Sequence, residues 1–304
     1  MTISERNILL DGDDQYCFLP EGVTLCYRIY GNADAIPLVL IAGLGLQLSY
    51  WPPKLVQGLV NEGFRVIIFD NRDSGCSSRS VCPVPSLWRQ ILWVPSPKSY
   101  GIEAMADDLS FLLNQLGITQ AHLVGMSMGG MIAQTFAIRH PKMTASLTSI
   151  FSTTGSRQVG QPAISSILMM MRPPAASRDQ AISQYRQMAR HIGPTRFNLN
   201  PEAVEAYAAN AWDRCGGTNA SEGVARQLGA IIQSGDRTSQ LSRIDAPTLV
   251  IHGDQDLMVN TSGGYATAAA IRQAKLKIIP GMGHFIGEGV TPELLDLILD
   301  HAIT

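Results

Sequence analysis

The sequence predicts an α/β protein in which a mostly parallel β-sheet is flanked by helices. Short apolar runs alternate with helix-like segments through the first half of the chain, a pattern typical of β-α-β units with right-handed crossovers. The alternation stops between about residues 154 and 240, where the chain is rich in Ala, Gln and Met, and then resumes. An ordinary crossover does not need so many residues, so we expect a helical insertion between two strands.

The first strands follow from the spacing of apolar side chains. Residues 23–29 alternate between apolar and polar side chains, as in a strand buried on one face. The runs PLVLIA at 37–42 and RVIIFD at 65–70 are almost continuously apolar, as in parallel strands covered on both faces. Further strands are expected at 121–125 and at about 144–151.

Helices are expected between these strands and near the end of the chain. One spans about 102–116 and stops at Gly117, and another spans about 128–139 and stops before a proline, which cannot continue a helix. A closing helix begins at Thr291, a favourable N-cap that is followed by the proline preferred at the first helical position.

The sheet resumes after the insertion. PTLVIHG at 247–253 and KLKIIP at 275–280 have the pattern of strands. We therefore expect one sheet domain in two segments, residues 1–153 and 241–304, with a helical cap formed by residues 154–240 between them.

Composition favours a compact protein and argues against several classes of partner. The 304 residues are 45% hydrophobic and only 16% charged, and the net charge is −2. The chain contains no basic run that would attract nucleic acid or anchor it to a membrane surface. We expect neither a nucleic-acid partner nor stable membrane insertion.

Cysteine usage and the N-terminus predict a cytoplasmic protein with reduced thiols. The N-terminus has acidic residues where a secretory signal has basic ones, and no apolar run approaches the roughly 18 residues of a membrane span. The cysteines are scattered, odd in number and without a C-x-x-C motif, which predicts neither a disulfide framework nor a zinc site. They are Cys17, Cys26, Cys76, Cys82 and Cys215.

The segment Gly125-Met126-Ser127-Met128-Gly129 fits the pattern G-x-S-x-G and lies where a predicted strand meets a predicted helix. A sharp turn at this point lifts the central serine clear of the sheet, and small residues on either side let the neighbouring elements approach. The helix N-terminus favours negative charge that develops beside the serine. Ser127 is therefore predicted to be a nucleophile, and the alternative is a simple helix N-cap.

A nucleophilic serine needs a base and an acid that orients this base. His284 lies in a glycine-flanked loop after strand 275–280, at the carboxyl end of a strand, where open α/β sheets place their sites. The turn after strand 247–253 offers two acids, Asp254 and Asp256. The remaining histidines have structural interpretations in strands, helices or the insertion; they are His122, His140, His191, His252 and His301.

The order of serine, acid and histidine, together with five landmarks, resembles the α/β-hydrolase superfamily. The similarity runs from about residue 22 to 303, and the landmarks together are far more specific than any one of them. In chain order they are AGLG at 42–45, FDNRDSGCSS at 69–78, GMSMGG at 125–130, PTLVIHGDQD at 247–256 and GMGHF at 281–285.

The resemblance implies the α/β-hydrolase fold, with an eight-stranded sheet, a helical cap and a catalytic triad of Ser127, Asp256 and His284. The superfamily pattern G-x-x-D selects Asp256 over Asp254. Backbone amides of Leu44 and Met128 correspond to the superfamily's oxyanion hole. The reaction implied requires no metal and no organic cofactor.

Two departures from the superfamily pattern stand out. Ala42-Gly43 occupies the place where many members carry His-Gly, so a role of that histidine is absent while the backbone donor remains. The loop after the fourth strand contains Arg72-Asp73-Ser74-Gly75 in place of Arg-Gly-x-Gly, which is similar to the aclacinomycin methylesterase branch of small cofactor-free esterases.

Four residues are expected to contact the substrate: Gly43, Trp88, Met126 and Met170. Trp88 belongs to a long segment at 79–99 whose apolar side chains either line an entrance, dock on the insertion, or form a membrane or dimer surface. Met170 belongs to the run ILMMM, which either floors an acyl pocket or forms helical core.

These features predict a carboxylic ester hydrolase that forms an acyl-enzyme with a small to medium, fairly apolar ester. Serine at the nucleophile position excludes haloalkane dehalogenase and epoxide hydrolase chemistry, which in this superfamily requires aspartate. A lactonase or polyketide methylesterase stays open, as do an acyltransferase, a perhydrolase and a non-catalytic ligand receptor. The expected partner is a small ester or lactone, and the oligomeric state is left open.

Overall fold

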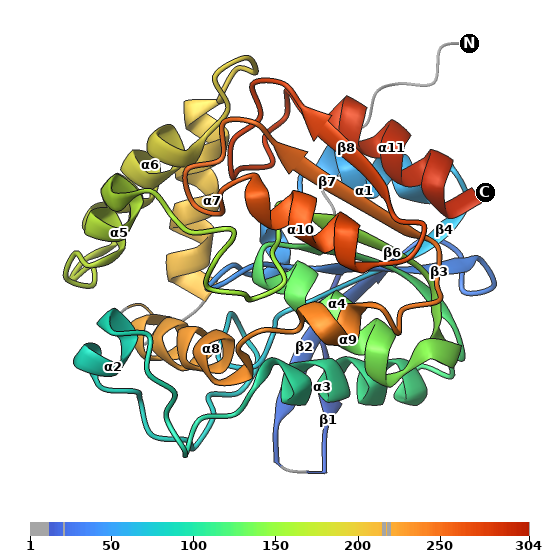
Figure 1. Ribbon diagram of the computed structural model, residues 1–304, viewed down its shortest axis with the longest axis horizontal. Helices are drawn as coiled ribbons and strands as arrows, with labels where there is room; N and C mark the ends of the chain where they lie inside the picture. Colours follow the sequence, from blue (N-terminus) through green and yellow to red (C-terminus); the bar gives the residue numbers. More distant parts are fainter. Residues whose placement is uncertain (1–11, 21, 215–216, 218–219, 304) are drawn as a thin grey trace.

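The computed structural model describes residues 12–20, 22–214, 217 and 220–303. Its centre is an eight-stranded sheet with strand order β1-β2-β4-β3-β5-β6-β7-β8 (Figure 1). β2 pairs antiparallel with β1 and β4, and the pairs from β4 through β8 are parallel, so the predicted fold class is confirmed. The strands are β1 (Gln15–Phe18), β2 (Thr24–Tyr30), β3 (Ile36–Ile41), β4 (Phe64–Phe69), β5 (Ala121–Met126), β6 (Thr144–Ile150), β7 (Thr248–Gly253) and β8 (Lys275–Ile279).

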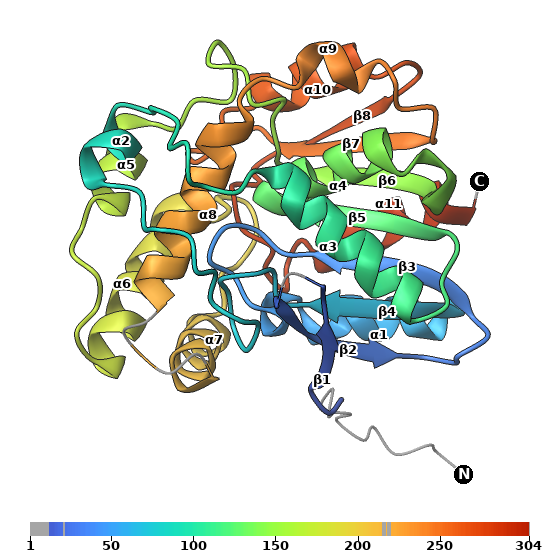
Figure 2. The same cartoon turned by 90° about the horizontal axis from the view of Figure 1, so that it is seen from below.

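Helices cover both faces of the sheet (Figure 2). α3 (Ile102–Gln115) and α4 (Met128–Arg139) pack against each other on one face, and α1 (Pro53–Asn61) and α11 (Thr291–Ile303) pack together on the other. The other elements outside the insertion are η1 (Leu48–Tyr50), α2 (Leu87–Ile91), η2 (Pro141–Met143), α9 (Thr238–Leu241) and α10 (Ser262–Ala270).

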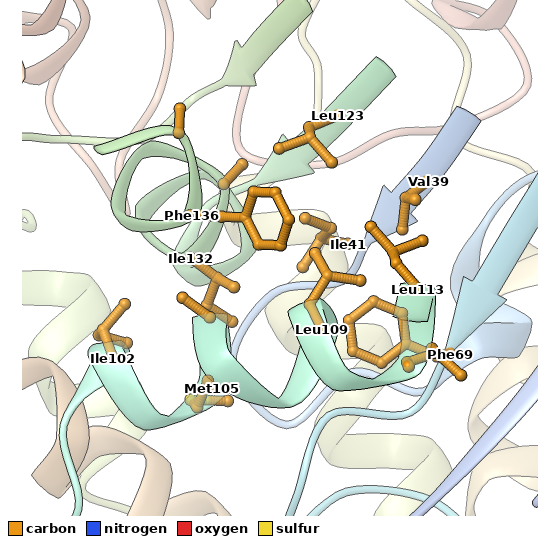
Figure 3. Packing of buried hydrophobic residues seen from close by; sticks show 14 of the residues in the cluster. Val39, Ile41, Phe69, Ile102, Met105, Leu109, Leu113, Leu123, Ile132 and Phe136 are labelled. Carbon is orange, nitrogen blue, oxygen red and sulfur yellow. The ribbon is translucent and has the colours of Figure 1, made fainter. Parts of the chain in front are cut away.

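Alternate side chains of the central strands enter two separate hydrophobic cores. Val39 and Ile41 of β3 join Phe136 of α4 in the core on the α3 and α4 side (Figure 3). Leu38 and Leu40 of the same strand enter the core beneath α1 and α11. Both faces of the strand are therefore buried, which explains why its sequence is continuously apolar.

A helical insertion separates β6 from β7. Its helices are α5 (Ile164–Met170), α6 (Arg178–Ile192), α7 (Pro201–Arg214) and α8 (Ala220–Ser234). α6 and α7 pack against each other, and α8 contacts α3. Both views place these helices together at one end of the molecule (Figures 1 and 2).

The two ends of the insertion lie side by side. The amide of Arg237 donates to the Thr154 carbonyl at 2.9 Å, and Arg237 Nη2 donates to the Thr153 carbonyl at 3.1 Å. A Cβ added at Gly155 would lie 2.1 Å from the Gly235 carbonyl oxygen, so the two backbones are in direct contact. Burial lowers the pKa of Arg237 to about 10.

An arginine that is largely shielded from solvent holds α7 to the sheet. Arg214 Nη1 lies 2.8 Å from Asp70 Oδ2, and Arg214 Nη2 lies 2.8 Å from Asp14 Oδ2. Asp70 also accepts hydrogen bonds from the amides of Leu48 and Cys76. A buried carboxylate without such partners is costly, so this network fixes the end of α7 against the loops after β3 and β4.

The boundaries expected from the sequence agree with the observed ones to within one residue for the strands and helices that were predicted. β1 and α10 were not predicted. β1 exposes three of its four side chains, and α10 consists largely of small residues, so neither carries a clear apolar pattern.

Replacement of Phe136 by alanine should lower the free energy of unfolding by roughly 3–5 kcal/mol, because this ring is fully buried in the core of Figure 3 and its loss leaves a cavity. Urea denaturation measures the change. The control is Tyr265→Ala on α10, where a half-exposed ring is removed and a change within about 0.5 kcal/mol is expected. Equal losses in the two variants would contradict the assignment of Phe136 to the core.

Candidate functional site

Ser127 lies in a strained turn between β5 and α4. Its backbone φ of 54° is positive, and residues other than glycine rarely adopt such a conformation. The strain follows from the close approach of the two elements. A Cβ at Gly125 would lie 2.2 Å from the Gly129 carbonyl oxygen, and one at Gly129 would lie 2.0 Å from the Ile41 carbonyl oxygen. Only glycine permits this contact at either position.

The structure brings Ser127, His284 and Asp256 into one hydrogen-bonded row. His284 Nε2 lies 2.9 Å from Ser127 Oγ, and His284 Nδ1 lies 2.7 Å from Asp256 Oδ2. The ring of Phe151 packs against the imidazole, with 4.4 Å between ring centroids. The His284 amide donates to the Ile192 carbonyl of α6, so the insertion helps to hold the histidine loop.

Asp256 is buried and surrounded by hydrogen-bond donors. Its Oδ1 accepts from the amides of Met258 and Val259, both at 2.8 Å. Its Oδ2 faces His284 and, at 3.3 Å, Nε2 of the fully buried His252. Burial alone would raise the pKa of Asp256. The charge that His284 can carry and the hydrogen bonds from both histidines outweigh burial and hold this pKa well below its usual range.

Asp254, the other acid of this turn, lies at the protein surface. It is exposed, and its Oδ1 accepts a hydrogen bond from the Gly281 amide at 2.6 Å, as a turn residue would. The other histidines also make contacts away from Ser127. They bond to Ser146 (His122), Asp107 (His140), Ser166 (His191), Val259 and Asp256 (His252), and Leu147 and Pro247 (His301).

Two backbone amides beside the serine have no hydrogen-bond acceptor among the described residues. A Cβ at Gly43 would lie 3.2 Å from Ser127 Cβ, so the loop after β3 touches the serine. Within the described ranges, neither the Leu44 amide in this loop nor the Met128 amide at the start of α4 donates a hydrogen bond. Two such donors are what an oxyanion beside Ser127 would need.

A cavity of about 460 Å³ opens over Ser127 and His284. The loop after β3 and the insertion helices α6, α7 and α8 supply most of its lining. No Asp, Glu, Lys or Arg side chain of the described residues lines it. Besides His284, its aromatic side chains are Tyr50, Phe151, Tyr185, Tyr207, Trp212 and Phe285.

Of the four expected substrate contacts, Gly43 and Met126 line this cavity, whereas Trp88 and Met170 do not. Trp88 on α2 and Met170 on α5 are respectively 51% and 41% exposed to solvent. The cavity therefore excludes two residues that the sequence placed at the substrate. α2 packs on α8 and α5 packs on α6, which leaves both side chains outside the cavity.

Sequence reasoning did not identify the aromatic lining from the insertion. Tyr185 and Tyr207 pack with 5.1 Å between ring centroids, and Tyr207 also meets Tyr50 edge-on at 5.4 Å. The available signal was helical spacing, because Tyr185, Met188 and Ile192 lie on one stripe of α6 that faces the cavity. The sequence does not show what that stripe faces.

The described residues hold one group with the spacing of metal ligands: Asp14, Cys26 and Cys76. Arg214 already occupies this group, since its Nη2 lies 2.8 Å from Asp14 and 3.3 Å from Cys26 Sγ. Burial raises the pKa of the Cys26 thiol, which disfavours the thiolate that a metal needs. Cys17, Cys26, Cys76 and Cys82 form no disulfide among the described residues, and Cys215 lies outside those residues.

Comparison with known proteins identifies the family. Residues 36–288 match the model of the alpha/beta hydrolase fold, so the chain belongs to that family, as the sequence landmarks predicted. No helix of the described residues is long and apolar enough to cross a membrane.

Similar proteins include enzymes that act on esters and lactones. The chain is 27% identical to 3-oxoadipate enol-lactonase 2 of Acinetobacter baylyi over 85% of this chain and 86% of that protein. It is 25% identical to a rhodomycin D methylesterase of Streptomyces peucetius over 92% of this chain and 95% of that protein. The solved enol-lactonase structure from Burkholderia xenovorans aligns with a TM-score of 0.71 and 24% identity over 95% of this chain and all of that one.

In the variant Asp256→Asn, the free energy of unfolding should fall less between neutral and acid pH than it does in the wild type. The folded protein holds the pKa of Asp256 below the ~3.9 of an unfolded chain, so the unfolded state takes up this proton first as pH falls. The wild type therefore loses this stabilisation progressively as the pH falls from about 5 toward the pKa of Asp256 in the folded protein. Asparagine does not titrate, so the variant has no such loss. Urea denaturation across neutral and acid pH measures the difference.

The matched control is Asp254→Asn, two residues away in the same turn and exposed. This control should follow the pH dependence of the wild type. If Asp256→Asn did so as well, the Asp256 carboxylate would not be the stabilised group that its contacts indicate.

Proposed function

We propose that this alpha/beta hydrolase is a carboxylic ester hydrolase in which Ser127 is the nucleophile, His284 the general base and Asp256 the residue that orients His284. One observation carries the proposal: a serine in strained backbone geometry lies 2.9 Å from an imidazole that in turn lies 2.7 Å from a buried carboxylate. This is the arrangement needed to turn a weak hydroxyl into a nucleophile.

In the proposed reaction, Ser127 Oγ attacks the ester carbonyl while its proton moves to His284 Nε2. The carbonyl oxygen becomes an oxyanion that accepts hydrogen bonds from the amides of Leu44 and Met128. The tetrahedral adduct then collapses: its C–O bond to the alkoxide breaks, His284 gives its proton to this alkoxide, and the alcohol departs and leaves an acyl-enzyme intermediate. Water attacks this intermediate with His284 again as base, and the acid is released as the proton returns to Ser127 Oγ.

The cavity supports a small to medium, uncharged and fairly apolar substrate. Its volume of about 460 Å³ lies within the usual range for small-molecule sites. Tyrosines, methionine and tryptophan cover its walls, and no charged side chain of the described residues lines it to receive an ionised substrate group. A carboxylate bound there would lose its hydration without gaining an ion-pair partner.

A lactonase is the second candidate, favoured by the similarity to 3-oxoadipate enol-lactonase 2 over most of both chains. The same serine chemistry opens a cyclic ester, and the alcohol then stays attached to the acyl group. The cavity favours uncharged lactones over lactones that carry a carboxylate. Acid release without free alcohol distinguishes this activity from hydrolysis of open esters.

Ser127→Ala should lower turnover of p-nitrophenyl esters by a factor on the order of 10⁶, because the nucleophile is removed while the fold is kept. A fluorophosphonate probe should label the wild type at Ser127 and leave the variant unlabelled. Ser239→Ala, which changes an exposed serine on α9, should keep full activity and labelling. Activity in Ser127→Ala close to that of the wild type would refute the proposal, and a folded wild type that resists the probe would favour a non-catalytic receptor.

A neutral diester such as dimethyl glutarate should be hydrolysed with kcat/KM at least about tenfold above that of its half-ester, because the half-ester buries an unpaired carboxylate. Gln184→Arg places a cation in the cavity lining and should lower the ratio of kcat/KM for the diester to kcat/KM for the half-ester. Gln187→Arg, one turn away on α6 and exposed, should leave it unchanged. Equal kcat/KM for the two wild-type substrates would contradict the proposed substrate class.

A further inference from the structure

Two segments next to the cavity expose large apolar side chains to solvent. One contains α2 and the residues after it, and the other is α5. Leu87, Ile164 and Leu168 are 65%, 77% and 63% exposed, and other large apolar side chains of the same two segments are exposed as well. We call this surface the apolar face; the side chains that define it are Leu87, Trp88, Ile91, Leu92, Ile164 and Leu168.

The two segments lie at the same end of the molecule in both views (Figures 1 and 2). Arg157, which precedes α5, donates from Nη2 to the Trp93 carbonyl at 2.5 Å and so connects them. The chain that follows α5 reaches the cavity, where Pro174 and Ala175 line it. The apolar face therefore borders the helices that cover Ser127.

The two segments that carry the apolar face are positively charged, although the whole chain carries a net charge of −2. Residues 79–100 and 155–178 contain arginine and lysine but no acidic residue. Arg89 donates to the Pro95 carbonyl, Arg157 to backbone carbonyls and Arg172 to the Gln187 side-chain carbonyl. In the described part of the chain, none of these three guanidinium groups contacts a carboxylate.

Exposed apolar side chains next to arginine and lysine fit the surface of an anionic lipid bilayer better than they fit a second copy of this chain. Tryptophan and leucine beside arginine and lysine are the side chains that enter the interfacial layer of a bilayer while cations contact anionic headgroups. Two exposed tryptophans, Trp88 and Trp93, lie in this segment, and Arg89 stacks over the Trp88 ring with 4.7 Å to its centroid. A second copy of this chain docked through the same face would bring like charges together.

We propose that the apolar face docks this protein on the surface of an anionic lipid bilayer. Leu87, Trp88 and the neighbouring aliphatic side chains enter the headgroup boundary, and Arg89, Lys98, Arg157 and Arg172 lie against the lipid phosphates. No helix crosses the bilayer in this arrangement. The proposal does not depend on the chemistry proposed for Ser127, because lipid binding is measured without turnover.

Co-sedimentation with vesicles tests the proposal. The protein should bind vesicles of phosphatidylcholine mixed with phosphatidylglycerol, should bind phosphatidylcholine alone at least about tenfold more weakly, and should dissociate as salt is added. Lys98→Glu combined with Arg172→Glu should weaken binding to the anionic vesicles roughly tenfold or more, since each cation near the surface contributes about 1 kcal/mol. Leu87→Ser combined with Leu168→Ser should weaken it to a similar degree.

Matched controls lie away from the apolar face. Ile303→Ser removes a side chain that is 67% exposed on α11, and Lys275→Glu reverses an exposed charge on β8; both should bind as the wild type does. Urea denaturation of every variant shows whether the fold is retained.

Three outcomes would overturn the proposal. The first is absence of binding to the anionic vesicles at low salt. The second is equal binding by the wild type and both folded double variants. The third is a concentration-dependent dimer that the same substitutions abolish while vesicles bind no protein, which would assign the apolar face to a second copy of the chain.

Discussion

Backbone contact between α4 and the ends of β3 and β5 decides where the serine sits. With a side chain at Gly125 or Gly129 the helix could not begin so close to the sheet, because the added Cβ would lie within 2.2 Å of a carbonyl oxygen. Ser127 connects these two elements over one residue and takes a positive φ to do so. Its hydroxyl is thereby presented to His284 at the carboxyl edge of the sheet. The strain is maintained by the two cores that hold the strand and helix in place.

The imidazole of His284 lies between two regions of different electrostatic character. On one side Asp256 receives two backbone amides and two histidines, so negative charge is stabilised there in a buried position. On the other side the described lining of the cavity carries no charged side chain, and Phe151 covers one face of the ring. Positive charge that forms on His284 would therefore be neutralised by Asp256 alone. In surroundings of low dielectric this pairing is stronger than it would be in water.

Local patterns predicted most of the strands, Ser127 and His284, because each depends on neighbours in the sequence, whereas the turn after β7 left Asp254 and Asp256 open and only the superfamily resemblance selected Asp256. β3 is buried on both faces over most of its length and is continuously apolar, and Ser127, Asp256 and His284 each follow directly after a strand or lie in the loop beyond it. The cavity wall depends instead on how separate helices pack. The apolar composition of α5 and α2 does not specify which side faces solvent, so Met170 and Trp88 were expected at the substrate while Tyr185 and Tyr207 were missed. Only the tertiary contacts α6–α7 and α2–α8 decide that question.

The side-by-side ends of the insertion have a consequence for how this protein can change. Arg237 donates one hydrogen bond to the Thr153 carbonyl and one to the Thr154 carbonyl, so the long excursion between these residues closes on itself beyond the carboxyl end of β6. The entropy of closing such a loop grows only slowly with its length, by roughly 0.6 kcal/mol for each doubling. Parts of the excursion away from Arg214 and Ile192 can thus be gained, lost or exchanged with little effect on the strands below it, because Arg214 of α7 pairs with the buried Asp70 and Ile192 of α6 accepts a hydrogen bond from the His284 amide. Changes in ligand preference therefore cost little free energy of folding. Ser127, Asp256 and His284 instead lie at the ends of strands in a sheet that tolerates little change.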